Sequence, residues 1–183
     1  MALTIAVLIK TYLVSPFFIP SNSMVPTILP ADKIMVNKLS YRMGDPHRGD
    51  IIVFHNPSTF GDDNSDESIP EKVVRNVLEA IGVRTGRPDD FIKRIIGLPG
   101  DTLEIRDEQV YINGDAITED YLPPGVHMPD FERQTIPQAH FFVMGDNRDN
   151  SIDSRSWGLV PEEEIVGEAF VRIWPIDRLG AVD

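Results

Sequence analysis

The strand signals of this chain constrain its fold more than any other feature. VYINGDAI at 110–117 places Asn113 and Gly114 between apolar flanks, and this dipeptide is the strongest short-range signal for a β-hairpin. KIMVNKLSY at 33–41 and TLEIR at 102–106 alternate apolar and polar residues, as half-buried strands do. These patterns predict strands joined by tight turns.

Further strands are indicated by short apolar runs, which are DIIVF at 50–54, FFVMG at 141–145 and IVGEAFVRIW at 165–174. Fifteen prolines and thirteen glycines punctuate the loops between such runs. We therefore predict a mainly β fold built on an antiparallel sheet.

Composition excludes several classes of protein. The chain has 183 residues, enough for one well-buried domain with an extra segment. It has no cysteine, which excludes disulfides, thiolate chemistry and cysteine-ligated metals. Its net charge of -12 repels nucleic-acid phosphates, so we expect no nucleic-acid partner.

Residues 1–19, MALTIAVLIKTYLVSPFFI, are the chain's one candidate for a membrane segment. A full span needs about 20 apolar residues, and Lys10 interrupts this one. A cleavable signal peptide would have a basic start and a small-x-small site, and neither is present. A packed strand or helix is a third interpretation, but we favour a membrane anchor, or the remnant of one, over residues 1–18.

Residues 57–90 interrupt the strand pattern, and we interpret them as an insertion in the β domain. STFGDDNSDES at 58–68 is acidic, yet it lacks the regular spacing and the glycine of a calcium loop. Ser68 and Glu71 then resemble a capping box before apolar residues at helical spacing, which predicts a short helix ending at Gly82.

No metal site is expected elsewhere in the chain. The four histidines lie far apart in the sequence and show no metal-type spacing; they are His47, His55, His127 and His140. Their ordinary interpretation is as surface or packing residues.

Ser23 stands in the run IPSNSMVPT at 19–27, between Pro20 and Pro26. A residue before proline is restricted to extended conformations, so the two prolines can hold this segment in a fixed pose. A serine hydroxyl is a weak nucleophile unless a neighbouring base takes its proton. The plain alternative is that Ser21 and Ser23 only cap a turn.

Lys93 stands in the run FIKRIIGLPGD at 91–101. Side chains alternate along a strand, so Lys93 and Arg94 point to opposite faces and one cation faces inward. A lysine held neutral by apolar burial can act as a base, because burial lowers its pKa by roughly 3 to 5 units. The plain alternative leaves both cations solvated at a strand end.

A third run, GDNRDNSIDSRSWG at 145–158, mixes charges with short hydrogen-bonding side chains. Together with the runs around Ser23 and Lys93, and with GDIIVF at 49–54, it resembles the conserved boxes of bacterial-type type I signal peptidases. The resemblance spans roughly residues 10–178. Asn22 and Ser156 stand where relatives often have glycine and tyrosine.

This resemblance implies a role for each site residue. Ser23 would be the nucleophile and Lys93 its general base. Ser21 would join the backbone N–H of Ser23 in the oxyanion hole. Ser151 would hydrogen-bond and orient the lysine amine, and Asp153 would pair with Arg155 beside the site.

The same resemblance implies an extended peptide bound at a sheet edge, with pockets that take the small residues of an Ala-x-Ala site. By position, the predicted walls of the pocket before the scissile bond are Ile19, Met24, Ile28, Phe91 and Ile92. No metal or cofactor is implied.

The expected protein is thus a membrane-anchored serine endopeptidase that removes signal peptides from exported preproteins. Residues 19–183 would form its catalytic domain, a monomer on the extracytoplasmic side of the cell membrane, held by a single-pass anchor that contacts lipid. Two alternatives stay open, a self-cleaving repressor of the related serine/lysine type and a non-catalytic, membrane-tethered β domain that binds exported peptides.

Overall fold

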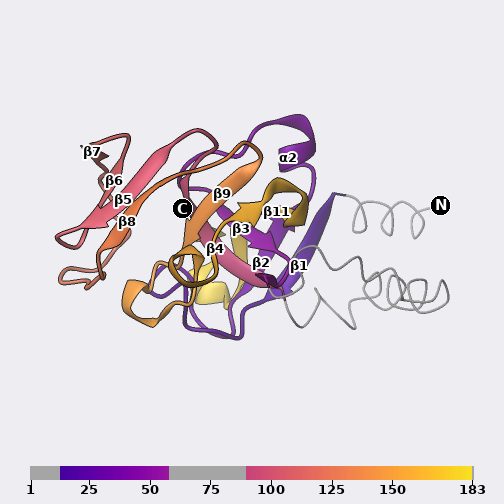
Figure 1. Ribbon diagram of the computed structural model, residues 1–183. Coiled ribbons are helices and arrows are strands. Elements are labelled where there is room, and N and C mark those ends of the chain that lie inside the picture. The colour runs from indigo at the N-terminus through magenta and orange to yellow at the C-terminus, as the bar shows by residue number, and fades with distance from the viewer. Residues whose placement is uncertain (1–12, 58–89, 183) are drawn as a thin grey trace.

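The main sheet of the protein is antiparallel throughout the part described, residues 13–57 and 90–182 of a computed structural model (Figure 1). Its strand order is β1-β2-β11-β3-β4-β9-β10, with β12 paired to β11. These strands are β1 (Val14–Phe18), β2 (Lys33–Asn37), β3 (Ile51–Phe54), β4 (Phe91–Gly97), β9 (His140–Met144), β10 (Val160–Pro161), β11 (Ile165–Trp174) and β12 (Gly180–Ala181). The predicted mainly β, antiparallel fold is confirmed.

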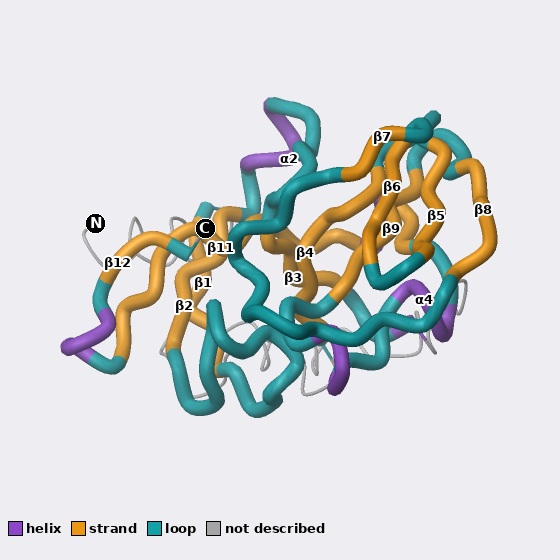
Figure 2. The backbone as a smooth tube through the Cα atoms, turned by 90° about the vertical axis from the view of Figure 1, so that its left-hand side faces the viewer, coloured by secondary structure: helices purple, strands orange, loops and turns teal. Residues whose placement is uncertain are grey.

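A second sheet has the order β7-β6-β5-β8 and is also antiparallel. Its strands are β5 (Thr102–Arg106), β6 (Gln109–Ile112), β7 (Asp115–Ala116) and β8 (Phe131–Thr135). Both views place it at the far end of the molecule from β1 and β2 (Figures 1 and 2). The short helical turns are α2 (Ser40–Met43), η2 (Arg148–Asn150), α4 (Ser154–Trp157), η3 (Glu162–Glu164) and η4 (Ile176–Arg178).

The predicted hairpin at 110–117 is confirmed. Tyr111 pairs with Ala116, and Ile112 pairs with Asp115 across the turn. Asn113 and Gly114 take positive φ values of 55° and 93°, the left-handed region that this tight two-residue turn requires. The asparagine and glycine are therefore placed where their conformational tolerance is used.

The strand predicted over 33–41 is shorter than expected. Strand β2 ends at Asn37, whose Oδ1 accepts a hydrogen bond of 3.0 Å from the backbone N–H of Leu39. This side chain to backbone bond turns the chain locally, and the single helical turn α2 follows.

The N-terminal part of the sheet begins earlier than predicted. The sequence predicts a membrane anchor over residues 1–18, but Val14–Phe18 form β1 and pair with β2 in the register Val14 to Asn37. The sheet therefore starts before residue 19. Residues 1–12 lie outside the described residues, as do the predicted helix and acidic loop at 58–82. Across 13–57 and 90–182, no helix has the length and apolar character needed to cross a membrane.

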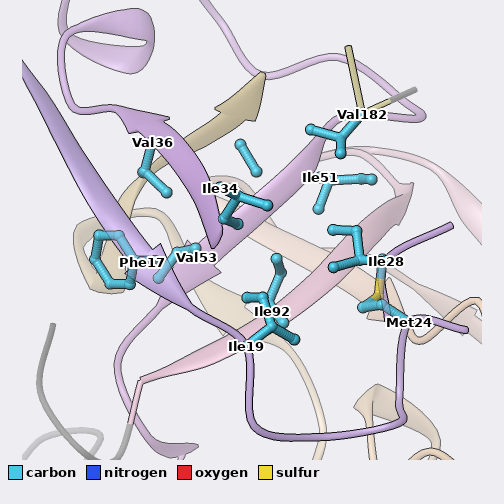
Figure 3. Close-up of a cluster of buried hydrophobic side chains, with 11 residues drawn as sticks. Phe17, Ile19, Met24, Ile28, Ile34, Val36, Ile51, Val53, Ile92 and Val182 are labelled. Carbon is cyan, nitrogen blue, oxygen red and sulfur yellow. The ribbon is translucent and has the colours of Figure 1, made fainter. Parts of the chain in front are cut away.

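Two strands far apart in the order of the main sheet approach each other through a shared core. Ile19 directly follows β1, and Ile92 lies on β4, which is four strands away in the sheet order. Both are buried in one cluster, and Figure 3 shows their side chains next to each other. The main sheet is therefore curled, and this curl brings the segment after β1 alongside the start of β4.

Candidate active site

Ser23 lies in the connection between β1 and β2. Met24 and Ile28 are fully buried in the core, and the backbone N–H of Ile28 donates a 2.9 Å bond to the carbonyl of Met24. The apolar side chains thus hold the connection against the sheet (Figure 3). Ser23 itself is only 9% exposed, so its hydroxyl has a defined surrounding rather than bulk solvent.

Lys93 reaches Ser23 from β4. Its Nζ lies 2.8 Å from Ser23 Oγ and also donates a 2.8 Å bond to the carbonyl of Ile92. Two residues separated by 70 positions in the sequence are thus joined directly. Lys93 is 3% exposed, so it is not solvated at a strand end. Its bond to Ser23 also shows that the Ser23 hydroxyl does more than cap a turn.

Burial lowers the pKa of the Lys93 amine from 10.5 to about 8, while the negative charges of Asp153 and Asp146 oppose this shift. Desolvation is the larger effect because an ammonium loses its hydration among apolar groups. The Lys93 amine therefore loses its proton far more readily near physiological pH than an ordinary lysine amine does. A neutral amine beside a serine hydroxyl can accept its proton.

Ser21 lies on the solvent side of Ser23. Its Oγ is 3.3 Å from Ser23 Oγ. Its side chain is exposed to solvent, in contrast to that of Ser23. The Ser21 hydroxyl therefore contacts both Ser23 and the solvent.

Ser151 does not hydrogen-bond Lys93, contrary to the prediction. Its Oγ is buried and has no hydrogen-bond partner among the described residues. It lies against Gly145, where an added Cβ would be 2.3 Å from Ser151 Oγ and 2.4 Å from the Ser23 carbonyl oxygen. The lack of a side chain at Gly145 therefore lets the 145–158 loop approach the backbone of Ser23.

The predicted ion pair between Asp153 and Arg155 is present. Arg155 Nε lies 2.8 Å from Asp153 Oδ1, and Asp153 is fully buried. The other carboxylate oxygen accepts a 3.0 Å bond from the backbone N–H of Gly145. Asp153 therefore connects Gly145, at the start of the 145–158 loop, to Arg155 in its second half.

A buried ion pair between Arg94 and Asp146 was not found from the sequence. The Arg94 guanidinium donates bonds of 2.9 and 2.8 Å to the two carboxylate oxygens of Asp146. Thr27 Oγ1 donates a third bond, of 2.5 Å, to Asp146. The expectation that Arg94 faces away from Lys93 is correct. A buried arginine needs an acid, and Asp146, two residues after the end of strand β9, was the signal that could have identified it.

Ser23 and Lys93 open onto a cleft of about 730 Å³. Of the predicted pocket walls, Ile19, Phe91 and Ile92 line this cleft. Met24 and Ile28 do not, and assigning them to the pocket was wrong, because both are fully buried in the core beneath it. Among residues 13–57 and 90–182, no three His, Asp or Glu side chains are grouped to hold a metal ion.

A serine hydroxyl bonded to a buried, partly neutral lysine at the floor of a cleft is the arrangement that a serine/lysine hydrolase requires. Residues 1–174 match the family described as "Signal peptidase, peptidase S26". The chain belongs to this family and is a peptide-bond hydrolase.

Similar proteins carry the same description. The chain is 39% identical over 181 residues to a probable signal peptidase I-2 of Synechocystis sp., covering 98% of this chain and 72% of that one. It is 37% identical over 182 residues to signal peptidase I of Leptolyngbya laminosa, covering 98% and 78%. A crystal structure of a signal peptidase I from Enterococcus faecalis V583 covers 68% of this chain and 96% of that one, with 30% identity and a TM-score of 0.47.

Proposed function

We propose that the protein is a serine endopeptidase that cuts signal peptides from exported preproteins after Ala-x-Ala sites, with Ser23 and Lys93 as its catalytic pair. The observation that carries the proposal is the 2.8 Å contact between Lys93 Nζ and Ser23 Oγ in a buried setting. Membership of the signal peptidase family supports the choice of substrate class.

In the proposed mechanism, neutral Lys93 takes the hydroxyl proton as Ser23 Oγ attacks the scissile carbonyl carbon. The proton then passes from Lys93 to the leaving amine as the peptide bond breaks and an acyl-enzyme remains. Water, deprotonated in turn by Lys93, attacks the acyl carbon; the bond between that carbon and Ser23 Oγ then breaks, and Lys93 returns the proton to Oγ. The carbonyl of Ile92, which accepts a bond from Lys93 Nζ, holds the amine in place through these steps.

The negative oxygen that forms during each attack needs hydrogen-bond donors. We assign this role to the backbone N–H of Ser23 and the hydroxyl of Ser21, whose Oγ lies 3.3 Å from Ser23 Oγ. Losing one such donor typically costs about 2.7 to 4 kcal/mol of transition-state stabilisation. Asp153, Arg155 and Asp146 hold the loops of the site, and the charges of Asp153 and Asp146 also partly oppose the lowering of the Lys93 pKa.

Cleavage of a preprotein with an Ala-x-Ala site tests the proposal, with N-terminal sequencing of the product. A cut after the second alanine is expected. A chain that cuts only itself would favour the repressor-type alternative, and a chain that binds the preprotein without cutting it would favour the non-catalytic alternative. The net charge of -12 already weighs against a DNA-binding repressor.

The rate of cleavage should rise with pH as Lys93 loses its proton. Because its pKa is about 8, kcat/KM should fall about tenfold for each pH unit below that value and level off above it. Initial rates measured from pH 5 to 10 with a peptide that has no titrating side chain check this. A rate that does not change over this range would exclude Lys93 as the base.

We also propose that residues 1–12 belong to a membrane anchor, or to the remnant of one, with the catalytic domain on the extracytoplasmic side of the cell membrane. The support is their largely apolar sequence and their position one residue before β1. The full chain should float with lipid vesicles on a density gradient, while a chain beginning at residue 13 should stay at the bottom. Equal flotation of both chains would contradict this assignment.

A further inference from the structure

Two large apolar side chains at the cleft are exposed to solvent. Phe18 is 51% exposed and Ile152 is 71% exposed, and both line the cleft that holds Ser23 and Lys93. The other exposed large apolar side chains of the described residues lie outside this cleft, and they are Phe170, Trp174, Ile176 and Leu179. An exposed apolar pair beside a reactive serine indicates a contact with what enters the cleft.

The position of Phe18 follows from the alternation of β1. Phe17 and Ile19 turn into the core, with 7% and 3% exposure, so Phe18 points to the opposite face. The backbone N–H and carbonyl of Ile19 are bonded to Asp32 and Ala31, on the β2 side. In an antiparallel strand the next residue uses the other edge, so the backbone groups of Phe18 point to the outer edge of β1. That edge is the end of the main sheet.

The neighbours of Ile152 in the chain fix its backbone, so that its side chain is exposed. The preceding Ser151 has a buried hydroxyl, and the following Asp153 is fully buried and bonded to Gly145. Arg155 also donates a 3.4 Å bond to the Ser151 carbonyl. The loop is thus fixed on both sides of Ile152, and its side chain is directed toward the cleft.

We propose that Phe18 and Ile152 contact the middle residue of the Ala-x-Ala site and favour an apolar side chain there. This rests on the proposed function. A substrate strand laid along the edge of β1 alternates its side chains between the two faces of the sheet, as β1 does. The two alanines then point inward, on the face of Ile19, and the residue between them points outward, on the face of Phe18.

The test compares two peptides that differ only in the middle residue, Ala-Leu-Ala and Ala-Ser-Ala. With the parent enzyme, kcat/KM should be higher for the leucine peptide. Phe18→Ser and Ile152→Ser should each lower the leucine-to-serine ratio about fivefold, the effect of losing part of an apolar contact. Phe170→Ser and Ile176→Ser are matched controls, since those side chains are 41% and 74% exposed and lie outside the cleft.

The same ratio should be measured as dissociation constants in the Ser23→Ala background, which separates peptide selection from turnover. A lower ratio in both cleft variants, with both controls unchanged, supports the proposal. A ratio within twofold of the parent in either cleft variant, or an equal fall in the controls, overturns it. The dissociation constants measure peptide binding alone, so both outcomes hold whether or not Ser23 and Lys93 are the catalytic pair.

Discussion

Replacing Ser23 by alanine, or Lys93 by methionine, should each reduce kcat for preprotein cleavage by about 10⁴-fold or more, because residues that act as one catalytic unit fail together. Alanine leaves no oxygen to attack the carbonyl. Methionine has about the length of lysine but cannot accept a proton. The double variant should be no slower than either single variant. Cleavage by any of the three above about 1% of the parent rate would end the assignment of this pair.

Matched controls separate the chemistry from the fold. Ser156→Ala and Lys33→Met change exposed side chains of the same two types and should leave kcat unchanged within about twofold. Circular dichroism should show that all variants are folded.

Lys93→Met should moreover be more stable than the parent at pH 7. The pKa of Lys93 is about 8 in the folded protein, and the ordinary value of 10.5 applies to the unfolded chain. Between pH 8 and 10.5 the folded state therefore binds fewer protons than the unfolded state. Stability therefore rises with pH through that window, and the cost of the buried ammonium is fully present below pH 8. Removing the amine should recover up to about 3 kcal/mol.

The fold could be predicted because its signals are local. Asn113 and Gly114 specify their turn by backbone conformation alone, and the apolar run at 51–54 forms β3 as expected. The end of β2 was missed because one hydrogen bond, from Leu39 N–H to Asn37, overrides the alternating pattern. The sequence of β1 also fits a membrane anchor, because an apolar strand in a sheet and an apolar membrane segment have similar composition.

The site was predictable in its residue types but not in its contacts. The apolar neighbours of Lys93 indicated a buried amine, and its lowered pKa agrees. The sequence could not distinguish Ile19, which faces the cleft, from Met24, which lies in the core, since both are apolar residues beside Ser23. Nor could it show that Ser151 packs against Gly145 instead of reaching Lys93, because that depends on how two loops meet.

The pair of Arg94 and Asp146 joins three parts of the site. Arg94 lies on β4 next to Lys93, Asp146 follows Gly145, and Thr27 comes four residues after Ser23. Arg94 Nη1 also donates a 2.8 Å bond to the carbonyl of Gly49, and the guanidinium lies 3.9 Å from the centre of the Tyr121 ring. Arg94 is 3% exposed and Asp146 is fully buried, so water cannot replace either partner.

Arg94→Met should therefore lower the free energy of unfolding by about 3 to 5 kcal/mol, the usual cost of leaving a buried charge without its partner. The double variant Arg94→Met/Asp146→Leu should recover part of this loss, because it removes the unpaired carboxylate as well. Arg133→Met is the matched control, since its side chain is 61% exposed and its pair with Glu104 spans 3.2 Å. An exposed pair is worth only about 0 to 1 kcal/mol. Urea unfolding of the full chain, analysed for midpoint and slope, measures the free energy of unfolding of all three variants. Equal losses in Arg94→Met and Arg133→Met would show that burial does not set the strength of the pair of Arg94 and Asp146.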